Sequence, residues 1–245
     1  MNLSGIPVTS LLGAALRYPL RWVPQRLTIP ILQGPLRGKK WIVGSSNHGC
    51  WLGSYEYEKQ RRFAKAVVPG AVVYDVGAHV GFYTLLASEL VGPRGRVIAF
   101  EPLSRNLHYL HKHLSLNKCA NVTVIEAAVS DVNTPVRFQE GPNSSMGYVA
   151  EQGSLEVKAV SLDELFVRRR APTPDVIKID IEGGEYRALR GATGLLAEVH
   201  PVVFLSTHSP EVRRQCCDVL EAFGYRLSSL TGKEVQDTDE LVCVA

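Results

Sequence analysis

The sequence predicts an α/β fold in which helices cover both faces of a doubly wound, mostly parallel sheet. Apolar strand-like segments alternate with helix-like segments from residue 72 onward, and this alternation is typical of such sheets. A glycine-containing turn follows the first of these strands, and acidic residues follow several of them. Because ligands of open α/β sheets bind outside the carboxyl ends of the strands, the sequence also predicts a Rossmann-like binding site there.

The stretch 72–82 predicts a buried strand, a tight turn and the start of a helix. Apolar residues lead into Asp75, and Gly77 and Gly81 then bracket the turn. A pyrophosphate-binding turn would have the spacing G-x-G-x-x-G, whereas this one is acid-x-Gly-x-x-x-Gly. The spacing favours S-adenosylmethionine, which has no phosphate. Its carboxylate can face the helix N–H groups and its ammonium group can face Asp75. The alternative is a plain strand–turn–helix unit with packing glycines.

A second acidic residue extends this prediction. Glu101 follows the strand 96–100 and lies twenty residues after Gly81, close to the offset of an acid that binds ribose hydroxyls. Pro102 ends that strand, and a solvated glutamate is the alternative reading. A third strand at 121–126 should end near the adenine. The predicted cofactor-binding residues are therefore Asp75, Gly77, Ala78, His79, Gly81, Glu101, Pro102, Glu126, Ala127 and Asp180.

Three motifs resemble one known family. D-V-G-A-H-V-G-F-Y-T at 75–84, A-F-E-P at 99–102 and D-V-I-K-I-D-I-E-G-G-E at 175–185 are similar to the FkbM family of S-adenosylmethionine-dependent methyltransferases, as is W-L-G-S-Y-E at 51–56. The resemblance covers roughly residues 50–210. It implies the seven-stranded sheet of class I methyltransferases. It also implies O-methylation of a hydroxyl on a sugar, glycolipid, polysaccharide or polyketide-like acceptor.

Two positions depart from the family pattern. His79 stands where the family usually has Asn, but both residues tolerate positive φ, so the turn should persist. Ser206 stands two residues before His208, where the family often has a carboxylate. If that carboxylate binds a metal or orients a base, we expect its role to be missing or carried elsewhere.

The predicted catalytic residues are Asp180, Glu182 and His208. Asp180 and His208 end neighbouring predicted strands, 175–180 and 201–208, so either can take the proton of an attacked hydroxyl. Alternatively, Asp180 and Glu182 hold Mg²⁺, a hard cation that prefers oxygen ligands. A third reading is that Glu182 and Glu185 cap the following helix.

The composition divides the chain into a basic N-terminal cap, residues 1–55, and a catalytic domain, residues 56–245. The cap has no acidic residue and six basic ones: Arg17, Arg21, Arg26, Arg37, Lys39 and Lys40. It predicts either a contact with a membrane surface or an anionic substrate, or simply a solvated face. A helix expected at 8–18 is too short to span a bilayer, and no basic segment precedes it as in a signal peptide. The five cysteines show no C-x-x-C spacing, which favours free thiols in the cytoplasm.

Other features give weaker predictions. His108, His111 and His113 share a helix expected at 103–117 and are interpreted as solvated surface residues. The loop 143–148 is interpreted as a substrate lid or a β-turn. A nucleic-acid methyltransferase is disfavoured, because no N-P-P-Y-like motif follows the fourth strand and the net charge is only +3. A non-catalytic S-adenosylmethionine-binding module is the other alternative, and the presence of Asp180 and His208 argues against it.

Overall fold

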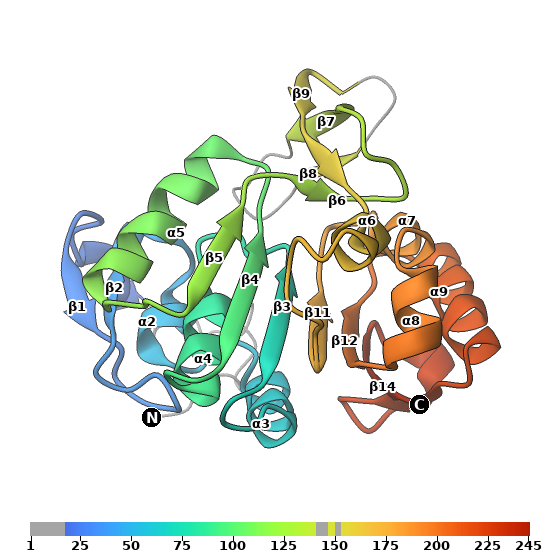
Figure 1. Cartoon of the computed structure of the whole chain (residues 1–245). Helices are drawn as coiled ribbons and strands as arrows, with labels where there is room; N and C mark the ends of the chain where they lie inside the picture. The colour runs from blue at the N-terminus through green and yellow to red at the C-terminus, as the bar shows by residue number, and fades with distance from the viewer. Residues whose placement is uncertain (1–17, 141–146, 150–152) are drawn as a thin grey trace.

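A seven-stranded sheet forms the centre of the protein in a computed structural model that describes residues 18–140, 147–149 and 153–245 (Figure 1). In spatial order its strands are β13 (Arg226–Ser229), β14 (Glu240–Val244), β12 (Val202–Ser206), β11 (Val176–Ile179), β3 (Val72–Val76), β4 (Arg96–Phe100) and β5 (Val122–Ile125). The strands from β12 to β5 run parallel, and β14 is antiparallel to both of its neighbours. The predicted doubly wound, mostly parallel sheet of seven strands is confirmed.

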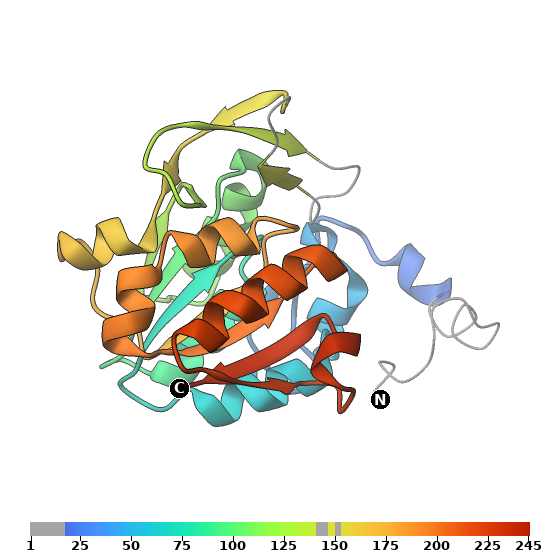
Figure 2. The same cartoon turned by 90° about the vertical axis from the view of Figure 1, so that its right-hand side faces the viewer.

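Helices cover both faces of this sheet, which explains why its central strands are almost continuously apolar. One face packs against α3 (Tyr57–Ala66), α4 (Phe82–Val91) and α5 (Ser104–Leu116). The other packs against α6 (Leu162–Val167), α7 (Glu185–Arg190), α8 (Thr193–Val199) and α9 (Pro210–Ala222). Figure 2 views the side on which the C-terminal helices, drawn in orange and red, lie. Alternate residues of one strand enter the two layers: Val73 packs with the first group and Tyr74 with the second.

Side-chain caps fix two of the helix starts at the expected places. The Ser161 hydroxyl accepts a hydrogen bond from the Glu164 amide and begins α6. Ser209 accepts one from the Val212 amide and begins α9, whose first residue is proline. These are the N-terminal signals that the sequence shows. The helix expected after Glu182 and Glu185 is α7, whereas the short helix α8 was not predicted.

The N-terminal segment is part of the first core layer. It contains η1 (Tyr18–Trp22), the antiparallel pair β1 (Thr28–Pro30) and β2 (Lys40–Ile42), η2 (Val43–Ser45) and α2 (His48–Leu52). Ile31, Trp41 and Trp51 are buried against α4 and α5. The helix expected at 8–18 lies almost wholly outside the described residues. Within the described residues, no helix has both the length and the apolar character needed to cross a bilayer.

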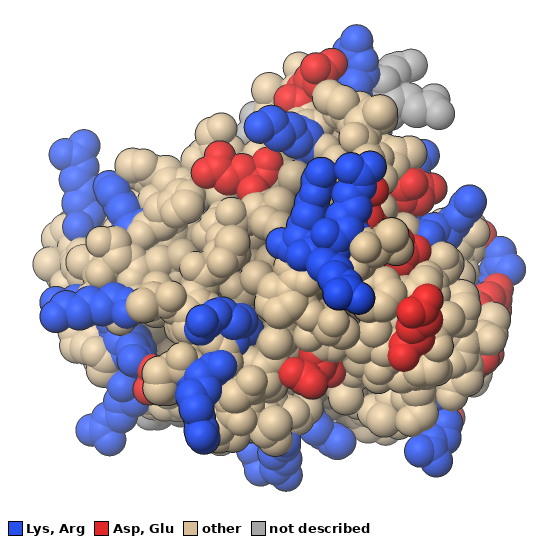
Figure 3. Space-filling view, in the orientation of Figure 1, with Lys and Arg blue, Asp and Glu red and all other residues tan. Residues whose placement is uncertain are grey.

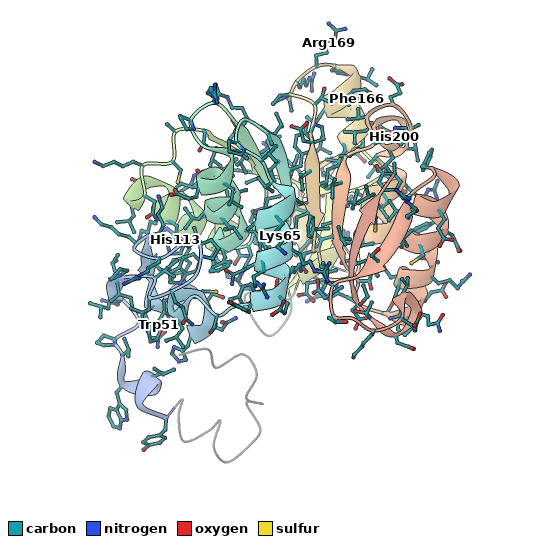
Figure 4. The ribbon with its side chains drawn as sticks, turned by 90° about the horizontal axis from the view of Figure 1, so that it is seen from below. Trp51, Lys65, His113, Phe166, Arg169 and His200 are labelled. Atoms are coloured by element: carbon teal, nitrogen blue, oxygen red, sulfur yellow. The ribbon has the colours of Figure 1, made fainter. Side chains whose placement is uncertain are left out.

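The prediction of a solvated His113 is wrong, although His108 and His111 are exposed. The His113 ring is completely buried between α5 and the N-terminal segment (Figure 4). Its Nδ1 donates to the Val80 carbonyl at 2.7 Å, and its Nε2 accepts from the Ile42 amide at 3.1 Å. These partners require the neutral ring. Burial lowers the pKa of His113 to about 4, only partly opposed by the hydrogen bond to Val80.

A small β excursion lies beyond the carboxyl end of β5 (Figure 1). It consists of the parallel pair β6 (Ala128–Val129) and β10 (Ala159–Val160) and the antiparallel sheet β8 (Gly147–Val149), β7 (Val136–Glu140) and β9 (Leu155–Val157). Most of the predicted lid, residues 143–146, lies outside the described residues. A short η3 (Val235–Asp237) precedes β14.

Candidate active site

The glycine turn joins β3 to α4 by left-handed backbone. Gly77 and Gly81 have φ values of 82° and 97°, and His79 between them has φ 50°. A Cβ on Gly77 would lie 2.0 Å from the Asp180 carbonyl oxygen, so only glycine lets β11 approach the turn this closely. The turn tolerates histidine at position 79, as expected.

Glu101 supports the turn from the end of β4. Its carboxylate accepts hydrogen bonds from the His79 amide at 2.8 Å, the Leu103 amide at 3.0 Å and the Asn106 side chain at 3.1 Å. Burial raises the pKa of Glu101, and these three donors oppose that shift. A carboxylate has about four acceptor positions, so Glu101 is held rigidly and can still accept from a ligand.

A hollow opens beside Glu101. Pro102, Ala127 and Asp180, all predicted ligand residues, form part of its wall. Its apolar wall consists of Phe100, Leu103, Ala127, Ala128, Val129 and Phe138. Glu126 is placed elsewhere, because its side chain is 63% exposed and lies 3.3 Å from His111 on α5.

A second hollow of about 510 Å³ adjoins the first. The two share four lining residues: Gly77, His79, Asp180 and Glu182. The predicted Ala78 lines the second hollow, together with Ser46, Cys50 and Tyr55 from the segment before α3. The glycine turn therefore separates an apolar compartment from one that the N-terminal segment helps to enclose.

Asp75 is buried beneath this second hollow. Its carboxylate accepts from the Thr84 hydroxyl at 2.6 Å and lies 3.3 Å from the Lys178 ammonium. Lys178, the direct register partner of Asp75 on β11, forms part of the wall. Asp75 itself is not among the residues that line either hollow.

His208 and three carboxylates meet where the hollows join. The His208 Nδ1 lies 2.7 Å from Glu185, and its Nε2 lies 3.6 Å from both Asp180 and Glu182. Burial lowers the pKa of His208, but the hydrogen bond with Glu185 and the three negative charges outweigh it and raise the pKa to about 9. Glu185 also accepts from the Ile181 and Gly183 amides, so it both closes the turn before α7 and holds the imidazole.

Asp180 lies between this histidine and two lysines. Its Oδ2 is 3.3 Å from Lys59 and 3.8 Å from Lys178, whereas its Oδ1 faces His208. Burial acts to raise the pKa of Asp180, but the three cations outweigh it and hold the pKa well below its usual range. The carboxylate is therefore ionised at neutral pH.

A carboxylate is present beside Ser206 despite the departure noted in the sequence. Ser206 of β12 and Glu240 of β14 are register partners in adjacent strands. The Ser206 hydroxyl lies 3.2 Å from the Glu240 carboxylate and also contacts the Lys59 ammonium. The neighbouring strand thus supplies the acid at this corner of the site.

Comparison with known proteins assigns the family. The family model described as "Methyltransferase FkbM domain" matches residues 75–227, which is more than half of the chain. The chain belongs to the FkbM methyltransferase family. The predicted family and the presence of a methyltransferase domain are therefore confirmed.

Two curated proteins are similar to this chain over part of their length. The hexuronic acid methyltransferase AglP of Haloferax volcanii is 30% identical over 134 residues, which cover 54% of each chain. The 31-O-demethyl-FK506 methyltransferase FkbM of Streptomyces tacrolimicus is 27% identical over 176 residues, which cover 55% of this chain and 67% of that protein. The chain thus spans about half to two thirds of these relatives.

Solved structures support the fold. The crystal structure of the methyltransferase FkbM from Methylobacillus flagellatus has a TM-score of 0.51 at 16% identity, covering 82% of this chain and 56% of that one. A putative rRNA-methylase from Clostridium thermocellum has a TM-score of 0.50 at 14% identity. The match covers 77% of this chain and 93% of that one. The class I methyltransferase architecture is thereby confirmed.

Sequence reasoning missed several residues of the candidate site in this chain. Lys178 had a recognisable signal, because a lysine inside an apolar strand must find a partner when it is buried. Lys59 had none, since it stands among other charged residues of α3. The predicted Mg²⁺ is not supported: among the described residues, no group of three or more His, Cys, Asp and Glu side chains is arranged to hold a metal ion.

Proposed function

We propose that the protein is an S-adenosylmethionine-dependent O-methyltransferase that acts on a hydroxyl of a sugar, glycolipid, polysaccharide or polyketide-like acceptor. One observation carries this proposal. A hollow walled by Glu101 and apolar side chains continues past the glycine turn to Asp180 and Glu182, which face His208. Cofactor-binding and proton-accepting groups thus lie along one crevice.

The residues present fit the cofactor. The apolar compartment suits an adenine ring, and Glu101 has acceptor capacity left for a ribose hydroxyl. Around the junction of the two hollows, six carboxylates face the three cations Lys59, Lys178 and His208: Glu56, Asp75, Asp180, Glu182, Glu185 and Glu240. This negative surplus suits the sulfonium and ammonium groups of S-adenosylmethionine, which supplies an electrophilic methyl group when it is bound.

We assign His208 as the base that accepts the proton of the attacked hydroxyl. Glu185 holds its Nδ1, so Nε2 is left facing Asp180 and Glu182, which line both hollows. A third group thus orients the base. With a pKa of about 9 the free imidazole is protonated at neutral pH, and a nearby cation favours loss of that proton. Asp180 is the alternative base, but its lowered pKa makes it a weaker one and suits it to holding a cation.

The acceptor class is inferred from the site and the relatives together. Ser46, Cys50 and Tyr55 form one wall of the second hollow, so we propose residues 1–55 as a cap that shapes the acceptor side. The two curated relatives are named for a hexuronic acid and for a demethylated FK506. Both are oxygen-rich small-molecule acceptors. We also propose a cytoplasmic location, because the five cysteines are free, as in most proteins of reducing compartments.

Calorimetry with S-adenosylmethionine and, separately, with NAD tests the cofactor assignment. We expect binding of the first and no comparable binding of the second. A radiolabelled methyl-donor assay over neutral glycans, uronate-containing glycans and macrolide polyketides then tests the acceptor. Tight binding of NAD, or methylation of RNA or DNA in place of every small acceptor, would reject the proposal.

We further propose that the N-terminal segment contacts an anionic membrane surface. Trp22 and Tyr18 are 77% and 58% exposed, and basic side chains project from the edge of the molecule near β1 and β2 (Figure 3). Exposed aromatics next to basic residues are typical of interfacial segments. The wild-type protein should float with phosphatidylglycerol vesicles but not with phosphatidylcholine vesicles. Trp22→Ala should reduce flotation, and equal flotation of both proteins would contradict the proposal.

A further inference from the structure

A buried lysine next to the crevice is not explained by cofactor binding or by proton transfer. Lys59 comes from α3 and is only 4% exposed. Its ammonium lies 3.3 Å from Asp180, 3.0 Å from Glu240 and 3.3 Å from Glu56. A charge taken this far out of water is tolerated only when it is fully paired, so the three carboxylates and Lys59 depend on one another.

The ammonium has three protons, and three acceptors meet it. The Asp180 carboxylate, the Ser206 hydroxyl and the Glu240 carboxylate each accept a hydrogen bond from Lys59. The Ser206 hydroxyl in turn donates to Glu240 at 3.2 Å. Because Ser206 and Glu240 are cross-strand register partners, the sheet itself fixes the position of the lysine.

This arrangement distinguishes the two oxygens of Asp180. Oδ2 faces the two lysines in the interior, at 3.3 Å from Lys59 and 3.8 Å from Lys178. Oδ1 lies on the other side, 3.6 Å from the His208 Nε2. The two lysines therefore pair with one oxygen of Asp180 and leave the other toward His208.

We propose that Lys59, clamped by Ser206 and Glu240, is a positioning residue that keeps Asp180 ionised and presents its Oδ1 to the cationic part of the methyl donor. This inference rests on the proposed S-adenosylmethionine site. Lys59 acts through Asp180 and does not itself touch the donor. Ser206 and Glu240 act one step further away, through Lys59.

The charges around Asp180 show why the lysine is needed. The titratable groups that face Asp180 come from α3 and its preceding loop, β11, the turn after β11, the end of β12 and β14: Lys59, Tyr55, Lys178, Glu182, His208 and Glu240. Glu182 and Glu240 favour protonation of Asp180, and so does its burial. Without Lys59, only Lys178 and His208 would oppose them.

The test measures S-adenosylmethionine affinity by calorimetry from pH 5 to pH 7.5, below the pKa of His208. In the wild type, Asp180 stays ionised over this whole range. We expect Lys59→Met to bind at least about tenfold more weakly at pH 5.5 and to recover part of this loss at pH 7.5, because Asp180 then titrates within the range. Glu58→Gln, which removes an exposed neighbour on α3 that pairs with Arg61, is the matched control and should match the wild type.

A swap across the strand pair tests the clamp. Glu240→Ser alone should weaken binding at every pH, because Lys59 is then held less firmly while a charge that favours protonation of Asp180 is also removed. Ser206→Glu combined with Glu240→Ser returns one carboxylate and one hydroxyl to the same pair and should restore affinity to within about threefold. Should Lys59→Met not fold, Glu240→Gln still tests how Lys59 is held, because Glu240 is partly exposed; it should weaken binding at every pH. A folded Lys59→Met or Glu240→Gln protein with wild-type affinity and pH dependence would overturn the inference, whereas a wild type that binds no S-adenosylmethionine would reject the proposed function along with it.

Discussion

The His208 imidazole and the Glu185 carboxylate are joined at 2.7 Å between Nδ1 and Oε1. Glu185 is completely buried at the start of α7, so its charge acts on the imidazole with little screening by solvent. The pair fixes the ring orientation and also raises the pKa of His208 to about 9. Orientation and proton affinity of the proposed base thus have one common source.

The pH dependence of turnover should change when this charge is removed. We expect Glu185→Gln to lower the pKa of His208 toward 6.5, so that the rising limb of turnover against pH moves to lower pH. Maximal turnover should also fall, because the ring is held less firmly. Methyl-transfer rates between pH 6 and pH 10 at saturating donor measure both effects. Glu198→Gln, at an exposed position of α8, is the control, and an unmoved profile in Glu185→Gln would remove the role of Glu185.

Loss of the Glu101 carboxylate should weaken cofactor binding. We expect Glu101→Ala to reduce S-adenosylmethionine affinity roughly 10- to 100-fold, since a hydrogen bond to a charged group contributes about 1.5–3 kcal/mol. Calorimetry measures the change. Glu126→Gln is an informative comparison, because Glu126 points away from the hollow. Its affinity should match the wild type, and a similar loss in both variants would place the adenine at Glu126.

The close approach at Gly77 can be separated from backbone strain by a matched pair of variants. Gly77→Ala places a Cβ 2.0 Å from the Asp180 carbonyl oxygen at φ +82°. Gly70→Ala has a similar φ of +91° but meets nothing within 4 Å. We expect Gly70→Ala to cost about 1–2 kcal/mol of stability, and Gly77→Ala to cost more and to lose S-adenosylmethionine binding. Urea unfolding and calorimetry test this, and equal losses would show that strain alone accounts for the glycine.

Acid should destabilise the fold through His113. Its pKa is about 4 in the folded protein, below the ordinary 6.5, so the unfolded chain binds the proton more tightly. Stability is therefore lost as pH falls from about 6.5 to 4, by ~3 kcal/mol. His113→Gln should be less stable at pH 7 and should lose less over this interval. Urea unfolding at several pH values measures the difference, with exposed His108→Gln as the control, and parallel curves for wild type and His113→Gln would exclude this source.

Much of the fold is predictable from local patterns. The strand at β3 and the caps Ser161 and Ser209 have signals that depend on neighbouring residues alone. The helix α8 has only seven residues and was missed. His113 was misinterpreted because its helix gives no sign that a distant segment, β2, covers it. Burial by a partner far away in the sequence has no local pattern.

The residues that line the crevice were predictable where they directly follow the end of a strand. Glu101, Pro102, Ala127, Asp180 and Glu182 all lie where the crevice is. The partners of these residues come from other elements, and pairings such as Lys59 with Glu240 are 181 residues apart in the sequence. Only the order of strands in the sheet brings them together, and no motif specifies it.

The ring of His113 ties the Ile42 amide to the Val80 carbonyl, and Val80 belongs to the glycine turn. The region that the family model matches begins at residue 75, yet this turn is held by β2, a strand well before that residue. A minimal catalytic fragment cut at that border, or a chimera that grafts a foreign leader onto it, would leave an imidazole and an apolar helix face without their cover. The unit to transplant in enzyme engineering is therefore larger than the recognisable motif, and it includes β2.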